Sequence, residues 1–308
     1  MTTPPLIAGV ELGGTKTICL LASGPDDIRE QVRIATTTPQ ATLAAVRAVL
    51  EGWRTGPGFA AVGVAGFGPL ELDPDQPDHG RIVSTPKPGW SGADVLGLAA
   101  GLGVPAALDT DVNGAALAEG LWGAAQGLDS WIYVTVGTGV GVGSVVSGRP
   151  IRGLGHSEAG HLRTPRPAGD GWPGACPWHG DCVEGLASGA AIRARTGRAA
   201  ETLPPDDPAW DGVVHALAGL LHNLILTTAP QRILLGGGIG LGQPQLLPRL
   251  RRALTASLAG YGATARIDPD QFLRPPGLGD RAGPLGAIAI GLDALRPEAI
   301  LSEPPASL

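Results

Sequence analysis

The sequence predicts an α/β protein made of two similar halves, and two observations lead to this expectation. Apolar stretches of strand length alternate along the chain with stretches in which apolar residues recur at helical spacing, an alternation typical of α/β folds. In addition, IAGVELGGTKTICLLAS and SWIYVTVGTGVGVGSVVSG each place a Gly-Thr pair in a hairpin between two apolar strands. Such a repeat predicts two α/β halves that each present one loop to a shared cleft.

The elements expected in the first half follow from apolar patterns and turn residues. A GGTK turn joins the first two strands, and a Thr-Pro pair marks the start of a helix. In chain order we expect strands over 6–12, 17–23 and 30–36, a helix over 38–53, a strand over 60–68, a short helix over 93–103, and a strand, a loop and a helix over 105–125. Asp111 and Asn113 then lie at the junction between the last strand and its helix.

The second half is expected to open with the repeated hairpin and to end in an apolar helix. Its expected elements are a strand–turn–strand unit over 130–148, a long apolar helix over 213–230, a strand entering a triple glycine over 231–240, and an apolar helix over 283–295. No linker interrupts this succession, so we expect the cleft to lie where the two halves meet.

Composition narrows the class of protein. The chain has 308 residues, of which 43% are hydrophobic, enough for one large domain or two ordinary ones. Its net charge is −6 and it has no basic stripe, which argues against a nucleic-acid partner. The N-terminus lacks the features of a signal peptide, and no apolar run reaches the roughly 18–20 residues that span a bilayer. We therefore expect a cytoplasmic protein with no membrane partner, in a compartment where disulfides are rare.

Three glycine-rich turns are candidate phosphate sites: Gly13-Gly14-Thr15-Lys16, Gly137-Thr138-Gly139-Val140-Gly141 and Gly236-Gly237-Gly238. Backbone N–H groups in such turns form a concavity that binds anions, and glycine allows a close approach that a Cβ would block. Neither the Walker A pattern nor the Rossmann fingerprint fits these turns. The better interpretation is two phosphate-binding hairpins and a third loop that packs on a nucleoside.

Asp109 and Asp111 follow a strand and come directly before a helix. A carboxylate at this position can accept a proton from a substrate hydroxyl, and a base of that kind is one of the few groups that phosphoryl transfer needs. Asp111 could equally cap the helix. These residues alone leave both interpretations open.

The segment GACPWHGDC indicates a metal site. Cys176, His179 and Cys182 provide three ligands within seven residues, and structural zinc takes four in a tetrahedron. His161 and His156 are the candidates for the fourth ligand. A redox pair is the weaker alternative, because the spacing is not CxxC. Cys19, in an apolar strand, is expected to be a core thiol.

Taken together, these motifs resemble one family. In order, the chain contains ELGGTK, GFGP, STPKPGW, DTDVNGAALAEG, TVGTGVGVG, HSEAGH, CPWHGDCVEGLASG and LGGGI. This combination resembles the ROK family of sugar kinases, in the actin-like ATPase superfamily, and is most similar to its bacterial fructokinases. The resemblance implies two actin-like, ribonuclease-H-like α/β domains with the active site in the cleft between them. The expected domains are 1–117 with about 285–308, and 118–284, which carries the zinc-binding loop.

The resemblance also implies a reaction and a set of roles. The enzyme would transfer the γ-phosphate of ATP to the 6-hydroxyl of D-fructose, with Asp111 as general base, Mg²⁺ on the phosphates and Zn²⁺ in a structural site. Expected ATP-binding residues are Gly13, Gly14, Thr15, Lys16, Thr135, Gly137, Thr138, Gly139, Gly236, Gly237 and Gly238. Expected substrate-binding residues are Gly66, Lys87, Trp90, Thr110, Asn113, Glu158, His161 and Glu184. The expected zinc ligands are His161, Cys176, His179 and Cys182, and Glu11 would hold Mg²⁺ through water.

Several alternatives remain beside this interpretation. Trp90 could stack on a sugar or simply fill the core, and His161 could serve the zinc ion, the sugar or both. Glu11 replaces the aspartate usual in the family, and Asp109-Thr110-Asp111 replaces the Glu-Asn-Asp of many hexose-specific members, which favours the fructokinase subgroup. A broader kinase for mannose, glucose or N-acetylhexosamine is the main alternative. A sugar-responsive regulator is disfavoured, because a strand beginning at residue 7 leaves no room for a helix-turn-helix. The family resemblance suggests a homodimer.

Overall fold

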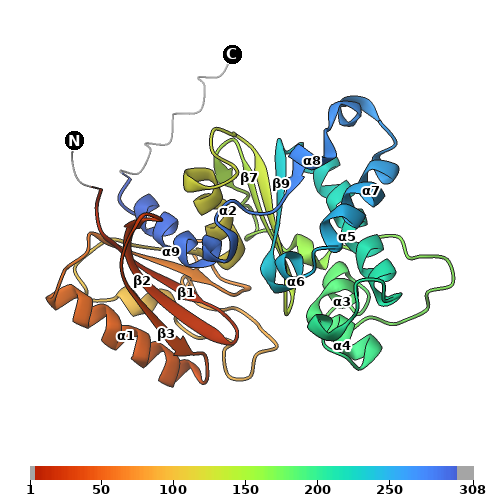
Figure 1. The fold of residues 1–308 in the computed structure, drawn as a ribbon. Helices are drawn as coiled ribbons and strands as arrows, with labels where there is room; N and C mark the ends of the chain where they lie inside the picture. Colours follow the sequence, from red (N-terminus) through yellow and green to blue (C-terminus); the bar gives the residue numbers. More distant parts are fainter. Residues whose placement is uncertain (1–3, 297–308) are drawn as a thin grey trace, which may run out of the picture. The chain divides into compact units, whose positions relative to one another are not determined.

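The computed structural model describes residues 4–296, which form two compact units (Figure 1). One unit comprises residues 4–111 and 284–296, and the other comprises residues 112–283. Each contains one five-stranded sheet with helices packed on it. The predicted α/β class with two similar halves is therefore confirmed.

The sheet of the first unit has the strand order β3-β2-β1-β4-β5. Its strands are β1 (Ile7–Leu12), β2 (Lys16–Gly24), β3 (Asp27–Ala35), β4 (Ala61–Gly66) and β5 (Ala106–Thr110). The first three strands are antiparallel neighbours, whereas β4 and β5 run parallel to β1. The last residues of β1, β4 and β5 therefore lie at one edge of the sheet.

Helices α1 (Pro39–Thr55) and α9 (Ala282–Asp293) cover opposite faces of this sheet (Figure 1). The Thr38 side chain caps α1 by accepting a hydrogen bond from the amide of Ala41. Ala8, Val10 and Leu12 of β1 belong to the core cluster that includes residues of α1.

Alternate residues of β1 face α9, because successive side chains of a strand point to opposite faces. Glycine is needed on this face: a Cβ on Gly9 would lie 2.8 Å from Ile288 Cδ1, and a Cβ on Gly63 would lie 1.9 Å from the Ala287 carbonyl oxygen. Glu11 is the next residue of β1 on the same face.

The sheet of the second unit has the order β10-β9-β6-β7-β8. Its strands are β6 (Trp131–Val136), β7 (Val140–Val146), β8 (Arg149–Pro150), β9 (Arg232–Gly236) and β10 (Leu273–Arg274). β6, β7 and β8 are antiparallel neighbours, and β9 and β10 run parallel to β6. Read from β8 to β10, this topology is the same as that of the first sheet, which is the structural counterpart of the sequence repeat.

The helices of the second unit pack on both faces of its sheet. They are α2 (Asp111–Trp122), α3 (Val183–Ala187), α4 (Gly189–Thr196), α5 (Ala209–Thr228), α6 (Gly237–Gly242), α7 (Leu246–Leu258) and α8 (Pro269–Phe272). The expectation that no apolar run reaches membrane-spanning length was wrong for α5, the one helix in the described part of the chain that is long and apolar enough to cross a membrane. Ten of its side chains are buried, and they belong to the core of this unit or line it.

α2 lies against the other face of this sheet, where glycines allow close contact. A Cβ on Gly143 would lie 2.2 Å from the Val112 carbonyl oxygen. The Trp131 indole donates a hydrogen bond to the carbonyl of Ala116 over 2.8 Å. The chain crosses from the first unit to the second at the very start of this helix, between residues 111 and 112.

Two local expectations were wrong. The helix expected over 93–103 is only a 3₁₀ turn, η1 (Leu96–Ala99). The Asp94 side chain accepts a hydrogen bond from the amide of Gly97, and the chain turns at Gly101 and Gly103, which both have positive φ. No loop separates β5 from α2, because the helix begins at Asp111, directly after the last residue of the strand.

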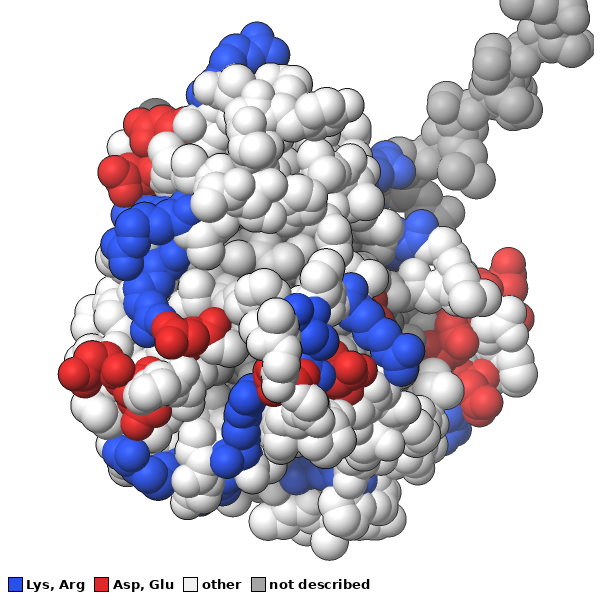
Figure 2. Space-filling view, turned by 90° about the vertical axis from the view of Figure 1, so that its right-hand side faces the viewer, with Lys and Arg blue, Asp and Glu red and all other residues white. Residues whose placement is uncertain are grey.

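Basic and acidic side chains are interspersed on the face that carries α7 and α8 (Figure 2). Ion pairs of the second unit include Arg166–Asp170, Arg195–Asp170, Arg198–Asp207 and Arg251–Asp270. Burial opposes ionisation of Asp170, but hydrogen bonds from Arg166 and Arg195 hold the pKa of its carboxyl at about 2. Asp170 thus ties residues 166–172 to α4.

Candidate active site and metal centre

The first glycine turn connects β1 to β2 and is largely open to solvent. The amide of Gly13 donates to the carbonyl of Lys16 over 3.1 Å, and a Cβ on Gly13 would lie 2.7 Å from that same oxygen. Gly14, Thr15 and Lys16 are exposed. Lys87 Nζ donates to the Gly14 carbonyl over 2.6 Å, so Lys87 supports the turn that carries Lys16.

Glu11 is a half-buried carboxylate one residue before the end of β1. The pKa of its carboxyl is raised to about 7, mainly by burial and also by the negative charge of Asp111, while the positive charge of Lys16 acts in the opposite direction. Glu11 therefore lies within electrostatic range of the candidate base and of the lysine of the first turn. A bound cation would favour ionisation of both carboxyl groups.

In protein free of metal and nucleotide, replacing Glu11 by glutamine is expected to raise the free energy of unfolding at high pH. The folded state binds the Glu11 proton more tightly than the unfolded state does. The wild-type protein therefore loses stability as the pH rises from 4.5 through about 7. The loss is on the order of 3 kcal/mol, since each pKa unit corresponds to about 1.4 kcal/mol. Glutamine remains neutral and escapes this loss.

Urea unfolding at a series of pH values measures this effect. The stability difference between the variant and the wild type should be small near pH 4 and should grow up to about pH 8. Glu51→Gln is a matched control, because Glu51 is exposed on α1 of the same unit. A stability difference that stays constant across the pH range would contradict the raised pKa of Glu11.

Asp111 is the accessible carboxylate of the Asp109-Thr110-Asp111 segment. Asp109, Thr110 and Asn113 are buried, whereas Asp111 is half-buried. Asp109 Oδ1 accepts a hydrogen bond from the amide of Thr110 over 2.7 Å. Asp111 lies in the first turn of α2, where the helix dipole also favours a negative charge. This position is compatible both with a general base and with a residue that caps the helix.

The structure favours the alternative in which Trp90 fills the core. Its side chain has no exposed surface, and its indole donates to the carbonyl of Thr37 over 2.9 Å. The ring of Phe67 meets it edge-on, with 5.2 Å between centroids. A ring without an exposed face cannot stack on a sugar in this arrangement. Gly66, the last residue of β4, is buried as well.

The second unit brings the other two glycine stretches together. In the β6–β7 turn, the amide of Gly137 donates to the carbonyl of Gly139 over 2.9 Å, and Thr138 is exposed. A Cβ on Gly137 would lie 3.7 Å from the amide nitrogen of Gly238. Gly237 has a φ of 83°, and a Cβ there would lie 2.5 Å from Thr135 Oγ1. The predicted phosphate turn and the predicted nucleoside loop are therefore neighbours.

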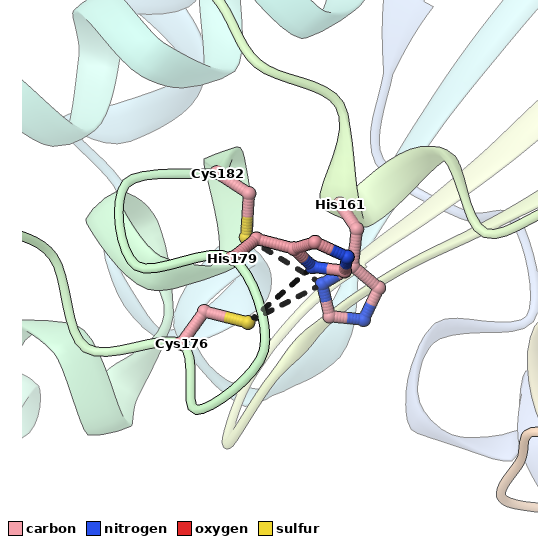
Figure 3. Close-up of side chains that lie close together, drawn as sticks. All are labelled: His161, Cys176, His179 and Cys182. Atoms are coloured by element: carbon pink, nitrogen blue, oxygen red, sulfur yellow. Dashed lines mark hydrogen bonds between the residues drawn. The ribbon is translucent and has the colours of Figure 1, made fainter.

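Figure 3 shows the four predicted metal ligands converging on one point. The ligand atoms of His161, Cys176, His179 and Cys182 all lie within 4.8 Å of one another. Cys176 Sγ lies 3.7 Å from Nδ1 of both histidines, and Cys182 Sγ lies 3.5 Å from His161 Nδ1. Tetrahedral zinc with sulfur and nitrogen ligands separates its ligand atoms by about 3.5 Å. The donor set and its spacing fit zinc.

The ligand loop is a tight knuckle closed by its own backbone. Cys176 and Gly180 exchange two backbone hydrogen bonds, of 3.1 and 2.9 Å, and Gly180 has a φ of 63°. A Cβ on Gly185 would lie 1.9 Å from the Gly180 carbonyl oxygen, so α3 packs directly on the knuckle. Burial raises the pKa of the Cys182 thiol to about 11; a bound metal ion would reverse this, because the thiolate is the ligand.

The two nitrogens of His161 face different groups. Nδ1 points to the cysteine sulfurs, whereas Nε2 lies 3.9 Å from Glu158 Oε2. The other oxygen of Glu158 lies 3.5 Å from His156 Nδ1. His161 therefore completes the four-ligand cluster, and His156 lies beside Glu158 instead. A carboxylate next to the second nitrogen of a metal-bound histidine commonly orients its ring.

Two carboxylates have contacts that sequence reasoning missed. Glu184 Oε2 accepts a hydrogen bond from the amide of Val140 over 3.0 Å. Glu119, buried within α2, accepts from the amides of Ala124, Gly277 and Leu278. An acid that follows a run of alanines and glycines within α2 was the available signal for Glu119. No local pattern links Glu184 to Val140.

Two units of one topology, each with a glycine turn after its first strand, define the two-domain actin-like ATPase fold. A solved structure of a ROK family glucokinase from Streptomyces griseus in complex with glucose and AMPPNP has a TM-score of 0.74 with this chain, at 24% identity. That comparison covers 94% of this chain and 99% of the glucokinase.

The chain belongs to the ROK family, whose sequence profile matches residues 7–294. It is 37% identical to a fructokinase from Pediococcus pentosaceus, over 94% of this chain and 99% of that protein. It is 40% identical to a fructokinase from Zymomonas mobilis, over 92% of this chain and 96% of that protein.

Proposed function

We propose that the chain is an ATP-dependent fructokinase, which transfers the γ-phosphoryl group of ATP to the 6-hydroxyl of D-fructose. The observation that carries this proposal is the alignment of fructokinases from two organisms with nearly the whole chain, at 37% and 40% identity. The accessible carboxylate of Asp111 lies within electrostatic range of Glu11, as does Lys16. These groups support the same activity, because phosphoryl transfer depends on a positioned base and on groups that hold the phosphates.

In this reaction Asp111 accepts the proton of the 6-hydroxyl as that oxygen attacks the γ-phosphorus. The bond from the γ-phosphorus to its bridging oxygen breaks, and ADP leaves. The turns at 13–16 and 137–139 and the glycines at 236–238 bind ATP, with exposed amides or a lysine toward the phosphates. Mg²⁺ bound with ATP would neutralise phosphate charge, and Glu11 would bind a water molecule of the Mg²⁺ hydration shell.

The sugar is expected to contact Glu158, His161 and Glu184, together with the segment around Asp111. Zinc would be held by His161, Cys176, His179 and Cys182 as a structural ion, because its four protein ligands leave no open position. A homodimer, the domain bounds 1–117 with about 285–308 and 118–284, and an active site between the domains remain predictions from the family resemblance. The cytoplasmic location remains a prediction from the sequence.

Initial rates of ADP release with MgATP test the proposed substrate. Fructose, mannose, glucose and two N-acetylhexosamines would be compared, and fructose is expected to have the highest kcat/KM by about tenfold or more. Asp26→Asn is a suitable control variant, because Asp26 is exposed at the β2–β3 turn. A higher kcat/KM for glucose or mannose would favour a broader hexose kinase, an alternative supported by the glucose complex of the Streptomyces griseus relative.

A further inference from the structure

The Val140 residue, which follows the predicted phosphate turn, is held from one side by Glu184. Glu184 Oε2 accepts the hydrogen bond of the Val140 amide over 3.0 Å. A Cβ on the preceding residue, Gly139, would lie 2.5 Å from that oxygen, so glycine is needed for the carboxylate to reach the turn. Hydrogen bonds from an amide to a carboxylate are stronger than those between neutral groups.

The same turn is held by two further segments. A Cβ on Gly160 would lie 1.9 Å from the Val140 carbonyl oxygen, so η2 (Ala159–His161) packs directly on this residue. The amide of Gly189, after the C-terminus of α3, donates to the Gly137 carbonyl over 2.7 Å. The turn therefore rests on η2 and on both ends of the α3 segment.

The metal ligands join these supporting segments. His161 is the last residue of η2, directly after Gly160. Cys182 is the N-cap of α3, and its Sγ accepts a hydrogen bond from the amide of Gly185 over 3.4 Å. Glu184 lies in the first turn of that short helix. A metal ion bound by both His161 and Cys182 would thus fix the positions of Gly160 and Glu184 around Val140.

We propose that Glu184 is a positioning residue for the nucleotide, and that the metal centre holds the 137–140 turn through Glu184 and Gly160. This inference rests on the proposed function, because it takes that turn as a phosphate-binding loop. It adds a coupling between two sites: loss of the metal weakens nucleotide binding as well as sugar binding.

Three substitutions of Glu184 separate this role from direct sugar binding. Glu184→Gln keeps a side-chain oxygen that can accept from Val140, so MgADP affinity measured by calorimetry without sugar should stay within about twofold. Glu184→Ala removes the acceptor, and Glu184→Asp withdraws it by one methylene. Both should weaken MgADP binding about tenfold. Glu201→Ala, an exposed glutamate of the same unit, is the matched control.

Hydrogen exchange of peptides covering 137–140 provides the second readout. Exchange in the absence of nucleotide should rise about tenfold in Glu184→Ala, Glu184→Asp and zinc-depleted wild-type protein, and should be unchanged in Glu184→Gln. If one variant does not fold, the other three samples still decide the question. Equal MgADP affinity in all variants, or equal losses in Gln and Ala, would overturn the positioning role. Unchanged exchange after zinc removal would overturn the coupling.

The proposed function can fail separately. A chain that binds MgADP and shows the exchange pattern but does not phosphorylate fructose refutes the substrate while supporting the inference. Wild-type protein that phosphorylates fructose but shows no response of the 137–140 turn to zinc or to Glu184 refutes the inference alone. Wild-type protein that does not bind MgADP refutes both.

Discussion

Replacing Asp111 by asparagine is expected to lower kcat for fructose phosphorylation by about 10²–10⁴-fold, the usual contribution of a general base. Asparagine keeps the size of the side chain but cannot take the proton of the 6-hydroxyl. Because the proposed base acts on the reacting hydroxyl, kcat and kcat/KM for fructose should fall together, and KM for ATP should change little. Steady-state kinetics with MgATP measures all three quantities.

A second readout ties the result to the local geometry. The negative charge of Asp111 contributes to the raised pKa of Glu11, so the Asn variant should titrate Glu11 at lower pH. The loss of stability that begins near pH 4.5 should consequently end at a lower pH and be smaller in total than in the wild type. Asp26→Asn, on the surface of the same unit, should leave both the kinetics and this titration unchanged. Normal turnover in Asp111→Asn would contradict the general-base role and would leave capping of α2 as the role of this residue.

Removing the metal is expected to have the largest effect on stability. The purified protein should contain about one zinc ion per chain, held by His161, Cys176, His179 and Cys182. A structural zinc ion contributes several kcal/mol to folding. Chelation or Cys182→Ala should therefore lower Tm by about 10 °C, at roughly 2–4 °C per kcal/mol in proteins of comparable size. Elemental analysis and thermal unfolding provide the measurements.

Cys19 is the matched control for the cysteine substitution. It is buried in β2, where burial raises the pKa of its thiol to about 12, and it lies outside the four-ligand cluster. Cys19→Ala should retain the full zinc content and lose only the stability of a small core side chain. Protein that carries no zinc, or an unchanged Tm after the Cys182 substitution, would disprove the structural role.

Most of the fold could be predicted because its signals are local. The apolar runs of β1, β2, β6 and β7 and the repeated Gly-Thr hairpins identify both sheets. β8 and β10 contain two residues each, too few for any alternation to show, and they form only because a longer strand lies beside them. Leu96–Ala99 has helical spacing, but Asp94 and the following glycines stop it after one turn.

The candidate site, too, could be predicted only where its sequence signals are local. Cys176, His179 and Cys182 are close in sequence, so their spacing predicts a cluster, and His161 does converge on it. Whether Trp90 is exposed or buried depends on Phe67 and Thr37, which the neighbouring sequence does not reveal. The bond from Val140 to Glu184 spans 44 residues. It depends on a single missing side chain at Gly139, which no sequence motif signals.

The matching topology of the two sheets has an evolutionary consequence. Glu11 and Thr135 are the penultimate residues of β1 and β6, while Lys16 and Val140 begin β2 and β7. Duplication of one ancestral unit produces this kind of correspondence. The two copies now differ: Glu11 and Lys16 flank the first hairpin, whereas main-chain groups and the hydroxyls of Thr135 and Thr138 lie at the second. In the proposed reaction the first copy would supply ionisable groups beside the reacting atoms, while the hairpins of both copies would contribute to binding ATP.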